Sequence, residues 1–217
     1  MTYTGRTHVG GPAAVHELTD LVISKLAVGT MDNNTYLLRC RTTGEQLLID
    51  AAAEPQRILD LVGPTGLATI VTTHAHPDHW QALSAVRAAT GARSLAHASD
   101  AEALGGLIDE TIADNQVLTV GRCTLRAVHL PGHTPGSIVL LYDDPVGHPH
   151  LFTGDCLFPG GVGKTANDND FQTLFSAVRD RVFATLPDET WVYPGHGNDT
   201  TLGAERPALA EWEARRW

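Results

Sequence analysis

The sequence has few cysteines and no long apolar run, and each absence excludes a class of protein. Its three cysteines, Cys40, Cys123 and Cys156, cannot all pair with one another, which argues against a disulfide-stabilised secreted scaffold. Residues 1–20 are polar and glycine-rich and lack the apolar core of a signal peptide or a membrane span. We therefore expect a cytoplasmic protein that does not enter a membrane.

Basic stripes and internal linkers are also lacking. The net charge is −10, and without a basic stripe nucleic acid is an unfavourable partner, so we expect a small-molecule substrate. No Ser/Pro-rich segment, charge block or repeat divides the chain, and 217 residues suit one α/β domain. The prediction is a single domain over residues 1–217 with a mobile amino terminus over residues 1–20. The sequence leaves the oligomeric state open.

The most informative feature that is present is a cluster of metal-binding side chain types. It consists of His74, His76, Asp78 and His79. The cluster follows the apolar residues 67–71, which predict a buried strand, and Pro77 restricts the backbone of the loop. Histidine is a common metal ligand, and alternating ligands on one short loop can face two adjacent ions. A histidine-rich surface turn is the alternative for this stretch taken alone.

Three further ligand candidates, His133, Asp155 and His196, lie downstream. Each follows a strand-like apolar run and is bordered by glycine, so each is expected on a tight turn at the end of a strand. Any one of them alone is more simply explained as an ordinary turn residue. Together with the cluster at residues 74–79, they can supply two ions with three or four ligands each if Asp155 bridges.

Five motifs in this order resemble those of the metallo-β-lactamase superfamily: Asp50 after an apolar strand, residues 74–79, His133, Asp155 and His196. The resemblance covers nearly the whole chain. It implies an α/β fold of the four-layer αββα sandwich type. It also implies that Asp50 orients a ligating histidine, whereas a helix cap or turn residue is the alternative for Asp50 alone.

The resemblance implies two metal sites that share one carboxylate. One metal would be held by His74, His76, His133 and Asp155. The other would be held by Asp78, His79, Asp155 and His196. Two zinc ions are the expected cofactors, with iron or manganese as alternatives.

Within this superfamily the motifs are most similar to those of short, single-domain glyoxalase II-like (hydroxyacylglutathione hydrolase-like) enzymes, which hydrolyse thioesters. Aspartate at position 155 differs from the lactamases that have cysteine there. The sequence departs from the family at Gln81-Ala82, where glycine is usual, and at Gly163-Lys164-Thr165, where an arginine-containing turn is usual. We expect no separate C-terminal substrate domain, because little chain follows His196.

Hydrophobic periodicity predicts strands alternating with helices in both halves of the chain, which favours two facing sheets with helices outside. The predicted strands are residues 21–28, 35–40, 46–50, 67–73, 93–96, 116–120, 124–129, 137–142, 150–153 and 190–193. The predicted helices are residues 55–62, 80–90, 100–104, 170–186 and 204–215. Asp170 is a candidate cap for the fourth helix. The ligand candidates should then gather along one edge of the sandwich.

Two ions about 3.5–4 Å apart would share a bridging hydroxide that attacks a carbonyl carbon. A thiol with a pKa near 8.5 leaves without a strong general acid, so the site suits a thioester. Asp78 is assigned as a metal ligand and as the proton acceptor. Lys164, on a glycine-rich turn after Asp155, is a candidate contact for an anionic substrate.

Three alternatives stay open at this point. The first is a mononuclear-iron persulfide dioxygenase, whose metal motifs are similar. The second is a lactonase. The third is a binding protein that has kept the scaffold without the catalysis.

Overall fold

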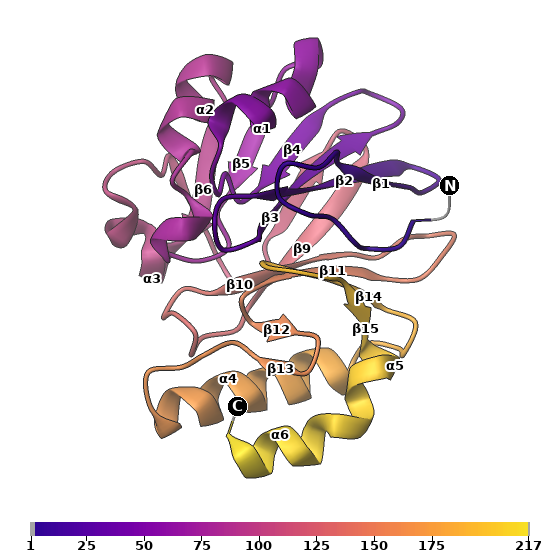
Figure 1. Ribbon diagram of the computed structural model, residues 1–217, viewed down its shortest axis with the longest axis vertical. Helices are drawn as coiled ribbons and strands as arrows, with labels where there is room; N and C mark the ends of the chain where they lie inside the picture. The colour runs from indigo at the N-terminus through magenta and orange to yellow at the C-terminus, as the bar shows by residue number, and fades with distance from the viewer. Residues whose placement is uncertain (1–2, 217) are drawn as a thin grey trace.

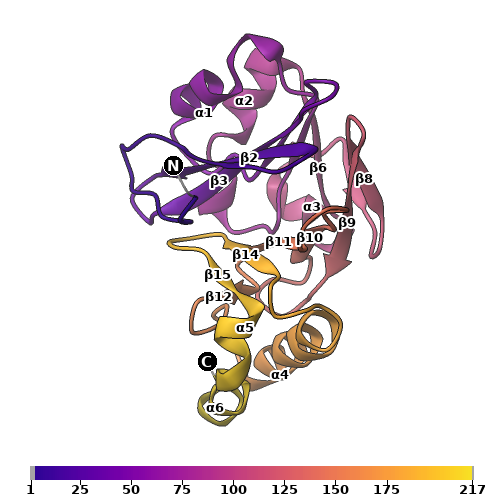
Figure 2. The ribbon, with the colours of Figure 1, turned by 90° about the vertical axis from the view of Figure 1, so that its right-hand side faces the viewer.

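The computed structural model describes residues 3–216 and forms four layers, with two sheets face to face and helices on their outer sides (Figures 1 and 2). The first sheet runs in chain order through β1 (Ala14–Glu17), β2 (Leu21–Val28), β3 (Asn33–Cys40), β4 (Gln46–Ile49), β5 (Thr69–Val71), β6 (Arg93–His97) and β7 (Glu110–Ile112). The second sheet has the order β15 (Thr200–Thr201), β14 (Trp191–Pro194), β11 (His150–Gly154), β10 (Ile138–Tyr142), β9 (Cys123–His129) and β8 (Val117–Val120). The predicted αββα sandwich is confirmed.

The main core lies between the two sheets, where alternate side chains of both sheets meet. Ile23 and Leu38 of the first sheet and Phe152 and Tyr193 of the second are fully buried there. The outer face of the first sheet packs on α1 (Pro55–Val62) and α2 (Leu83–Thr90). The outer face of the second sheet packs on α4 (Asp168–Val178) and α6 (Leu209–Arg215). Each helix therefore buries one apolar stripe, as an amphipathic helix must.

The strand directions bring the predicted ligand loops to one edge of the sandwich. β5 is parallel to β4 and β6, and β11 is parallel to β14. His74 follows β5, His133 follows β9, Asp155 follows β11 and His196 follows β14. Carboxyl ends of parallel strands share an edge, so residues distant in sequence meet there.

Most predicted elements are present, and two coincide with the prediction: β2 and α1. The predicted helix at residues 204–215 is wrong as a single helix, because Pro207 lies in a 3-10 turn (Arg206–Ala208) between α5 (Leu202–Glu205) and α6. The cap of α4 is Asn167, not Asp170: the Asn167 side chain accepts a hydrogen bond from the Asp170 backbone N–H at 3.0 Å. The short strands β1, β7, β12 (Leu157–Phe158), β13 (Gly161–Val162) and β15 were not predicted.

The amino-terminal segment also differs from the expected mobile residues 1–20. From residue 3 onward it packs on the body of the protein, and residues 1–2 lie outside the described part. β1 pairs antiparallel with β2, and His16 Nδ1 lies 2.8 Å from the hydroxyl of Tyr193. The Tyr3 hydroxyl donates to Asp199 Oδ2 at 2.7 Å.

A buried ion pair joins this segment to the loop that carries His196. Lys25 Nζ lies 2.6 Å from Asp199 Oδ1, and both side chains are 0% exposed. Lys25 Nζ also donates to the carbonyl oxygens of Gly5 at 2.8 Å and Gly197 at 2.6 Å. One buried ammonium group therefore connects β2, the amino-terminal segment and the residue directly after His196.

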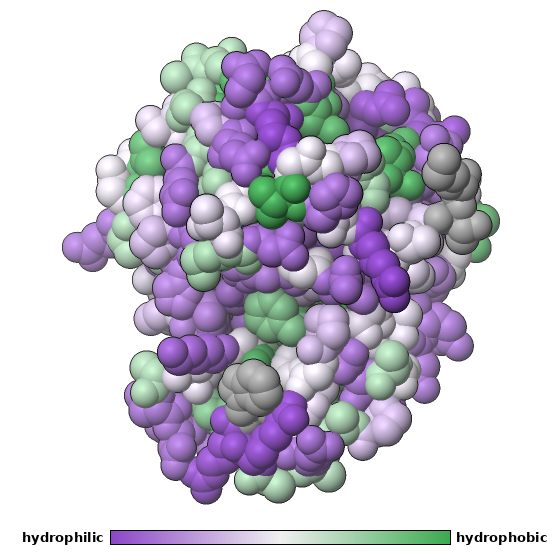
Figure 3. All heavy atoms as spheres, in the orientation of Figure 1, coloured by the Kyte–Doolittle hydropathy of each residue, from purple (hydrophilic) through white to green (hydrophobic). Residues whose placement is uncertain are grey.

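The surface in the orientation of Figure 1 is mostly hydrophilic, with hydrophobic residues scattered among the polar ones (Figure 3). Within residues 3–216, no helix has the length and apolar character that are needed to cross a lipid bilayer.

Candidate metal centre

The structure brings all seven predicted ligand residues together at the edge of the sandwich. His76 Nδ1 lies 2.8 Å from His133 Nε2, and His79 Nε2 lies 3.1 Å from His196 Nε2. Among residues 3–216, three groups have ligand atoms close enough to one another to hold one ion. These groups are His74, His76 and His133; Asp50, His74 and His79; and Asp78, His79 and His196.

Asp155 lies between the two pairs of histidines. Its Oδ2 atom is 3.5 Å from His133 Nε2, 3.4 Å from His196 Nε2 and 3.9 Å from His74 Nε2. Its Oδ1 atom is 3.3 Å from His79 Nε2. Burial opposes ionisation of this carboxyl group, but hydrogen bonds with His196 and His79 outweigh burial and hold the pKa of Asp155 well below its usual value. An ionised carboxylate thus faces histidines of both predicted sites.

Three of the histidines are held so that Nδ1 points away from the centre. His79 Nδ1 lies 2.9 Å from Asp50 Oδ2, and the Nδ1 atoms of His133 and His196 lie 2.7 Å and 2.8 Å from the carbonyl oxygens of Lys164 and Met31. A carbonyl oxygen only accepts hydrogen bonds, so His133 and His196 each carry a proton on Nδ1. Their neutral forms therefore direct an unprotonated Nε2 lone pair inward, which is the form that binds a metal.

Such inward lone pairs repel one another unless a cation or a proton lies between them. In the absence of metal, burial disfavours charge on His79, but hydrogen bonds with Asp155 and Asp50 outweigh burial and raise the pKa of His79 to about 10. Burial and the nearby His79 lower the pKa of His74 well below its usual value, so His74 is neutral. A divalent cation bound here would replace the proton on His79.

One buried polar atom in the centre, His74 Nε2, lacks a hydrogen-bond partner within the described chain. A buried polar atom without a partner costs about 1–3 kcal/mol, whereas coordination to an ion would satisfy it. A donor set of imidazole nitrogens and carboxylate oxygens suits zinc and iron, so the residues present fit a metal centre.

Asp50 lies behind the histidines, as expected for an orienting carboxylate. Its Oδ2 atom accepts hydrogen bonds from Thr73 Oγ1 at 2.8 Å and contacts His79, and its Oδ1 atom accepts from the Thr73 backbone N–H at 2.7 Å. Thr73 Oγ1 in turn lies 3.0 Å from His74 Nδ1. One buried carboxylate thereby fixes the rings of His79 and, through Thr73, of His74.

A close approach of two loops requires glycine at position 195. A Cβ atom there would lie 2.1 Å from Asp155 Oδ1 and 2.8 Å from His79 Cε1. Distances this short are not tolerated, so any side chain at position 195 would displace Asp155 from the centre. In the sequence this glycine indicates only a turn before His196. The structure shows that glycine is also needed there to leave room for Asp155 and His79.

Sequence reasoning missed two polar residues that support the centre. Asn33 Nδ2 donates to Asp78 Oδ2 at 2.8 Å and orients that carboxylate. Asp100 Oδ2 accepts from the Ala75 backbone N–H at 2.8 Å and from Thr134 Oγ1 at 2.6 Å, and its Oδ1 accepts from the Gly136 backbone N–H at 2.7 Å. Asp100 therefore ties the His74–His79 loop to the His133 loop. In the sequence it is an ordinary polar residue at the start of a predicted helix, with no motif around it.

We expect Asp100→Ala to weaken metal binding by about 10- to 100-fold, the usual range for loss of a group that orients ligands. The cause is loss of hydrogen bonds to two ligand loops, while every ligand is kept. Chelator competition measures the affinity. Glu102→Ala, at an exposed acidic residue two positions away, is the matched control and should leave the affinity unchanged. Equal affinities of the two variants would contradict a role for Asp100.

The family model, the curated relatives and the solved structures that resemble this chain agree with one another on its family. The family model of the metallo-beta-lactamase superfamily matches residues 28–196. Hydroxyacylglutathione hydrolase of Polaromonas sp. is 34% identical over 180 residues, which cover 81% of this chain and 66% of that protein. Persulfide dioxygenase ETHE1 of Bos taurus is 37% identical over 172 residues, which cover 75% of this chain and 63% of that protein. The solved structure of TTHA1623 in a di-iron-bound form is 30% identical with a TM-score of 0.69, covering 84% of this chain and 96% of that chain.

These matches identify the family and leave the reaction open. The chain spans about two thirds of the length of the two curated relatives, and those relatives are enzymes of different classes, a hydrolase and a dioxygenase. The matched residues include every member of the candidate metal centre, from Asp50 to His196. The chain belongs to the metallo-β-lactamase superfamily.

Proposed function

We propose that this chain is a dinuclear metal-dependent hydrolase that cleaves thioesters of the glyoxalase II type. The observation that carries the proposal is the ionised Asp155 carboxylate between two sets of inward-facing histidine nitrogens. One ion would be held by His74, His76, His133 and Asp155. The other would be held by Asp78, His79, His196 and Asp155.

When bound, the two ions would supply a hydroxide at neutral pH and an electrophilic centre for the substrate carbonyl oxygen. Asp155 and the histidines orient that centre, since their rings are fixed from behind by Asp50 and backbone carbonyl groups. Asp78 Oδ2, held by Asn33, lies 3.4 Å from His196 Nε2 and 3.5 Å from His79 Nε2, and we assign it as the proton acceptor. The thiol product can leave as a thiolate without a dedicated acid.

A small cavity beside the centre suits an acyl or thiol group. Its volume is about 230 Å³. It is lined by Phe158, Pro159, Gly160, Gly161, Val162, Gly163 and Lys164. The ring of Phe158 lies 6.2 Å from that of His196, and the Lys164 carbonyl contacts His133, so the cavity adjoins the centre. A small-molecule substrate and a cytoplasmic location stay part of the proposal.

The test combines metal analysis with assays of thioester turnover, lactone turnover and oxygen uptake. The proposal requires about two metal ions per chain, turnover of a small thioester, and no oxygen uptake with a persulfide. The second candidate, a mononuclear-iron persulfide dioxygenase, is favoured by the 37% identity to the bovine enzyme. It requires about one iron per chain and oxygen uptake, and that result would overturn the hydrolase. Lactone turnover without thioester turnover would instead identify a lactonase.

We expect Lys164→Ala to raise KM for anionic thioesters by about 2- to 5-fold, the size of one partly screened charge interaction. The Lys164 side chain is exposed at the rim of the cavity, so its loss should leave metal content intact and kcat less affected. Steady-state kinetics on matched anionic and neutral thioesters measure the effect. Equal losses on both substrates would show that the Lys164 charge does not select anionic substrates, and no loss on either would show that Lys164 is an ordinary surface residue.

A further inference from the structure

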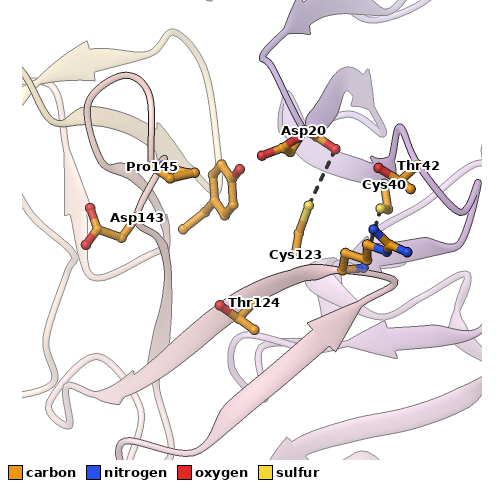
Figure 4. A pocket seen from close by; sticks show the side chains of 9 residues that line it. Asp20, Cys40, Thr42, Cys123, Thr124, Asp143 and Pro145 are labelled. Atoms are coloured by element: carbon orange, nitrogen blue, oxygen red, sulfur yellow. Dashed lines mark hydrogen bonds between the residues drawn. The ribbon is translucent and has the colours of Figure 1, made fainter.

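A second cavity lies at the opposite edge of the sandwich from the metal centre. Its volume is about 450 Å³ (Figure 4). It is lined by Asp20, Cys40, Thr42, Arg122, Cys123, Thr124, Tyr142, Asp143 and Pro145. Cys40 ends β3 and Cys123 begins β9, whereas the metal loops follow the carboxyl ends of β5, β9, β11 and β14. The two cysteines come from different sheets, so this cavity is where the sheets meet at that edge.

The two thiols are neighbours with unlike surroundings. Burial favours the neutral form of Cys40, but hydrogen bonds from the Thr43 side chain and from backbone N–H groups, including that of Arg122 at 3.5 Å, outweigh burial and lower the pKa of Cys40 to about 6. Burial and the adjacent Cys40 thiolate raise the pKa of Cys123 to about 11. Cys123 Sγ donates a hydrogen bond to the Asp20 carbonyl oxygen at 3.4 Å, drawn as a dashed line in Figure 4, and both thiols line the same cavity.

Several charged or titratable groups surround the two thiols, and the pKa of Cys40 stays below that of Cys123 in their presence. Asp20 and Arg122 line the cavity near the thiols, Asp143 lines it next to the end of β10, and the Tyr142 hydroxyl lies close to Cys123. Glu45 Oε1 accepts a hydrogen bond from the Gly121 backbone N–H at 3.0 Å and so fixes the β8–β9 turn against Cys40. A Cβ atom at Gly121 would lie 2.9 Å from Cys40 Sγ, which shows how closely this turn covers the thiol.

We propose that Cys40 and Cys123 form a dithiol site that reacts with low-molecular-weight disulfides, with Cys40 as the attacking thiolate and Cys123 as the resolving thiol. The Cys40 thiolate attacks one sulfur of the disulfide, forms a mixed disulfide and releases the other half as a thiolate. Cys123 then attacks Cys40 Sγ, forms the Cys40–Cys123 disulfide and releases the second half, which takes the Cys123 proton. Two protein thiols are oxidised and one small disulfide is reduced to two thiols.

The lower pKa of Cys40 and the higher pKa of Cys123 favour this order of the two steps. Cys40 is a thiolate at neutral pH and can attack first. Cys123 is still protonated at that pH, so it reacts only after the mixed disulfide has formed beside it. All three cysteines are buried, but only Cys40 and Cys123 line this cavity. Cys156 lies in the helix-covered core, where its Sγ is 3.7 Å from the Leu130 carbonyl oxygen, and it serves as an internal control. The inference is independent of the metal chemistry, since none of the cavity residues belongs to the metal centre.

The test treats the full-length protein with bis(2-hydroxyethyl) disulfide at pH 7 and maps the products by tryptic digestion and mass spectrometry. The expected product links the peptides of residues 40–41 and 123–126, while Cys156 stays a free thiol. Cys123→Ser should stop at the mixed disulfide on Cys40. Cys40→Ser should form no adduct on Cys123 over the same time.

A pH profile separates an activated thiol from a merely accessible one. In Cys123→Ser, the rate of Cys40 alkylation by iodoacetamide should reach half its plateau near pH 6, compared with about 8.5 for the same thiol in the urea-unfolded chain. A midpoint unchanged by folding would overturn the proposal. So would absence of the linked peptides, linkage of Cys156, or an adduct on Cys123 in Cys40→Ser.

Discussion

Replacing Asp155 with alanine is expected to remove both metal ions and to lower thioester turnover by at least about a thousandfold. The reason is that, within residues 3–216, Asp155 is the one residue in hydrogen-bond or ion-pair range of histidines from both proposed sites. Its loss would take a ligand from each ion and leave two cations facing each other without a shared anion. A metal centre contributes several kcal/mol of transition-state stabilisation, and each 1.36 kcal/mol corresponds to a tenfold change in rate.

The measurements are metals per chain after desalting and turnover of a small thioester. His76→Ala is the comparison, because it would remove one ligand from one ion only, and it should retain more metal and more activity than Asp155→Ala. Circular dichroism checks that both variants fold. Two tightly bound metals and a near-normal rate in Asp155→Ala would show that Asp155 does not bridge.

Lys25→Met is expected to lower the free energy of unfolding by about 3–5 kcal/mol, the usual effect of removing one partner of a buried ion pair. Methionine fills similar space, so the loss comes mainly from the buried Asp199 carboxylate that remains. Burial already raises the pKa of Asp199 even with Lys25 beside it. Protonation removes the charge, so the deficit of the variant should shrink as the pH falls toward about 4, the unfolded-state pKa of aspartate.

Urea denaturation in the presence of a chelator measures this loss without a contribution from metal binding. Arg93→Ala is the matched control, because Arg93 pairs with Glu110 at 2.7 Å but their side chains are 62% and 52% exposed. An exposed pair contributes about 0–1 kcal/mol. If Lys25→Met and Arg93→Ala were equally stable, the buried pair would not hold the amino-terminal segment in place.

The gathering of the candidate ligands at one edge of the sandwich could be predicted because these residues carry local signals. Four of the ligand candidates each follow an apolar strand: His74, His133, Asp155 and His196. The end of such a strand can be recognised in the sequence, because an apolar run stops there and glycine follows or borders it. Once the strands are placed in two sheets with parallel neighbours, these ends must lie together. The chemistry of the side chains then indicates a metal site before any distance is known.

The supporting residues could not be predicted, for a physical reason. Asp100 acts through backbone N–H groups of Ala75 and Gly136, so its function depends on tertiary contacts and leaves no pattern in the sequence around it. Asn33 reaches Asp78 across 45 positions. The short strands β1 and β7 could not be predicted for the same reason. An edge strand of three or four residues forms because a neighbouring strand pairs with it, more than because of its own composition.

The histidines of the centre lie close together in space but far apart along the chain, and this separation affects the order of folding events. His79 and His196 meet although 117 positions separate them in the chain. Closing so long a loop costs conformational entropy, and contacts of high sequence separation form slowly. Metal uptake at full affinity is therefore expected only after both sheets have docked. Refolding in the presence of a coloured metal ion would then show the absorbance change lagging behind the gain of secondary structure.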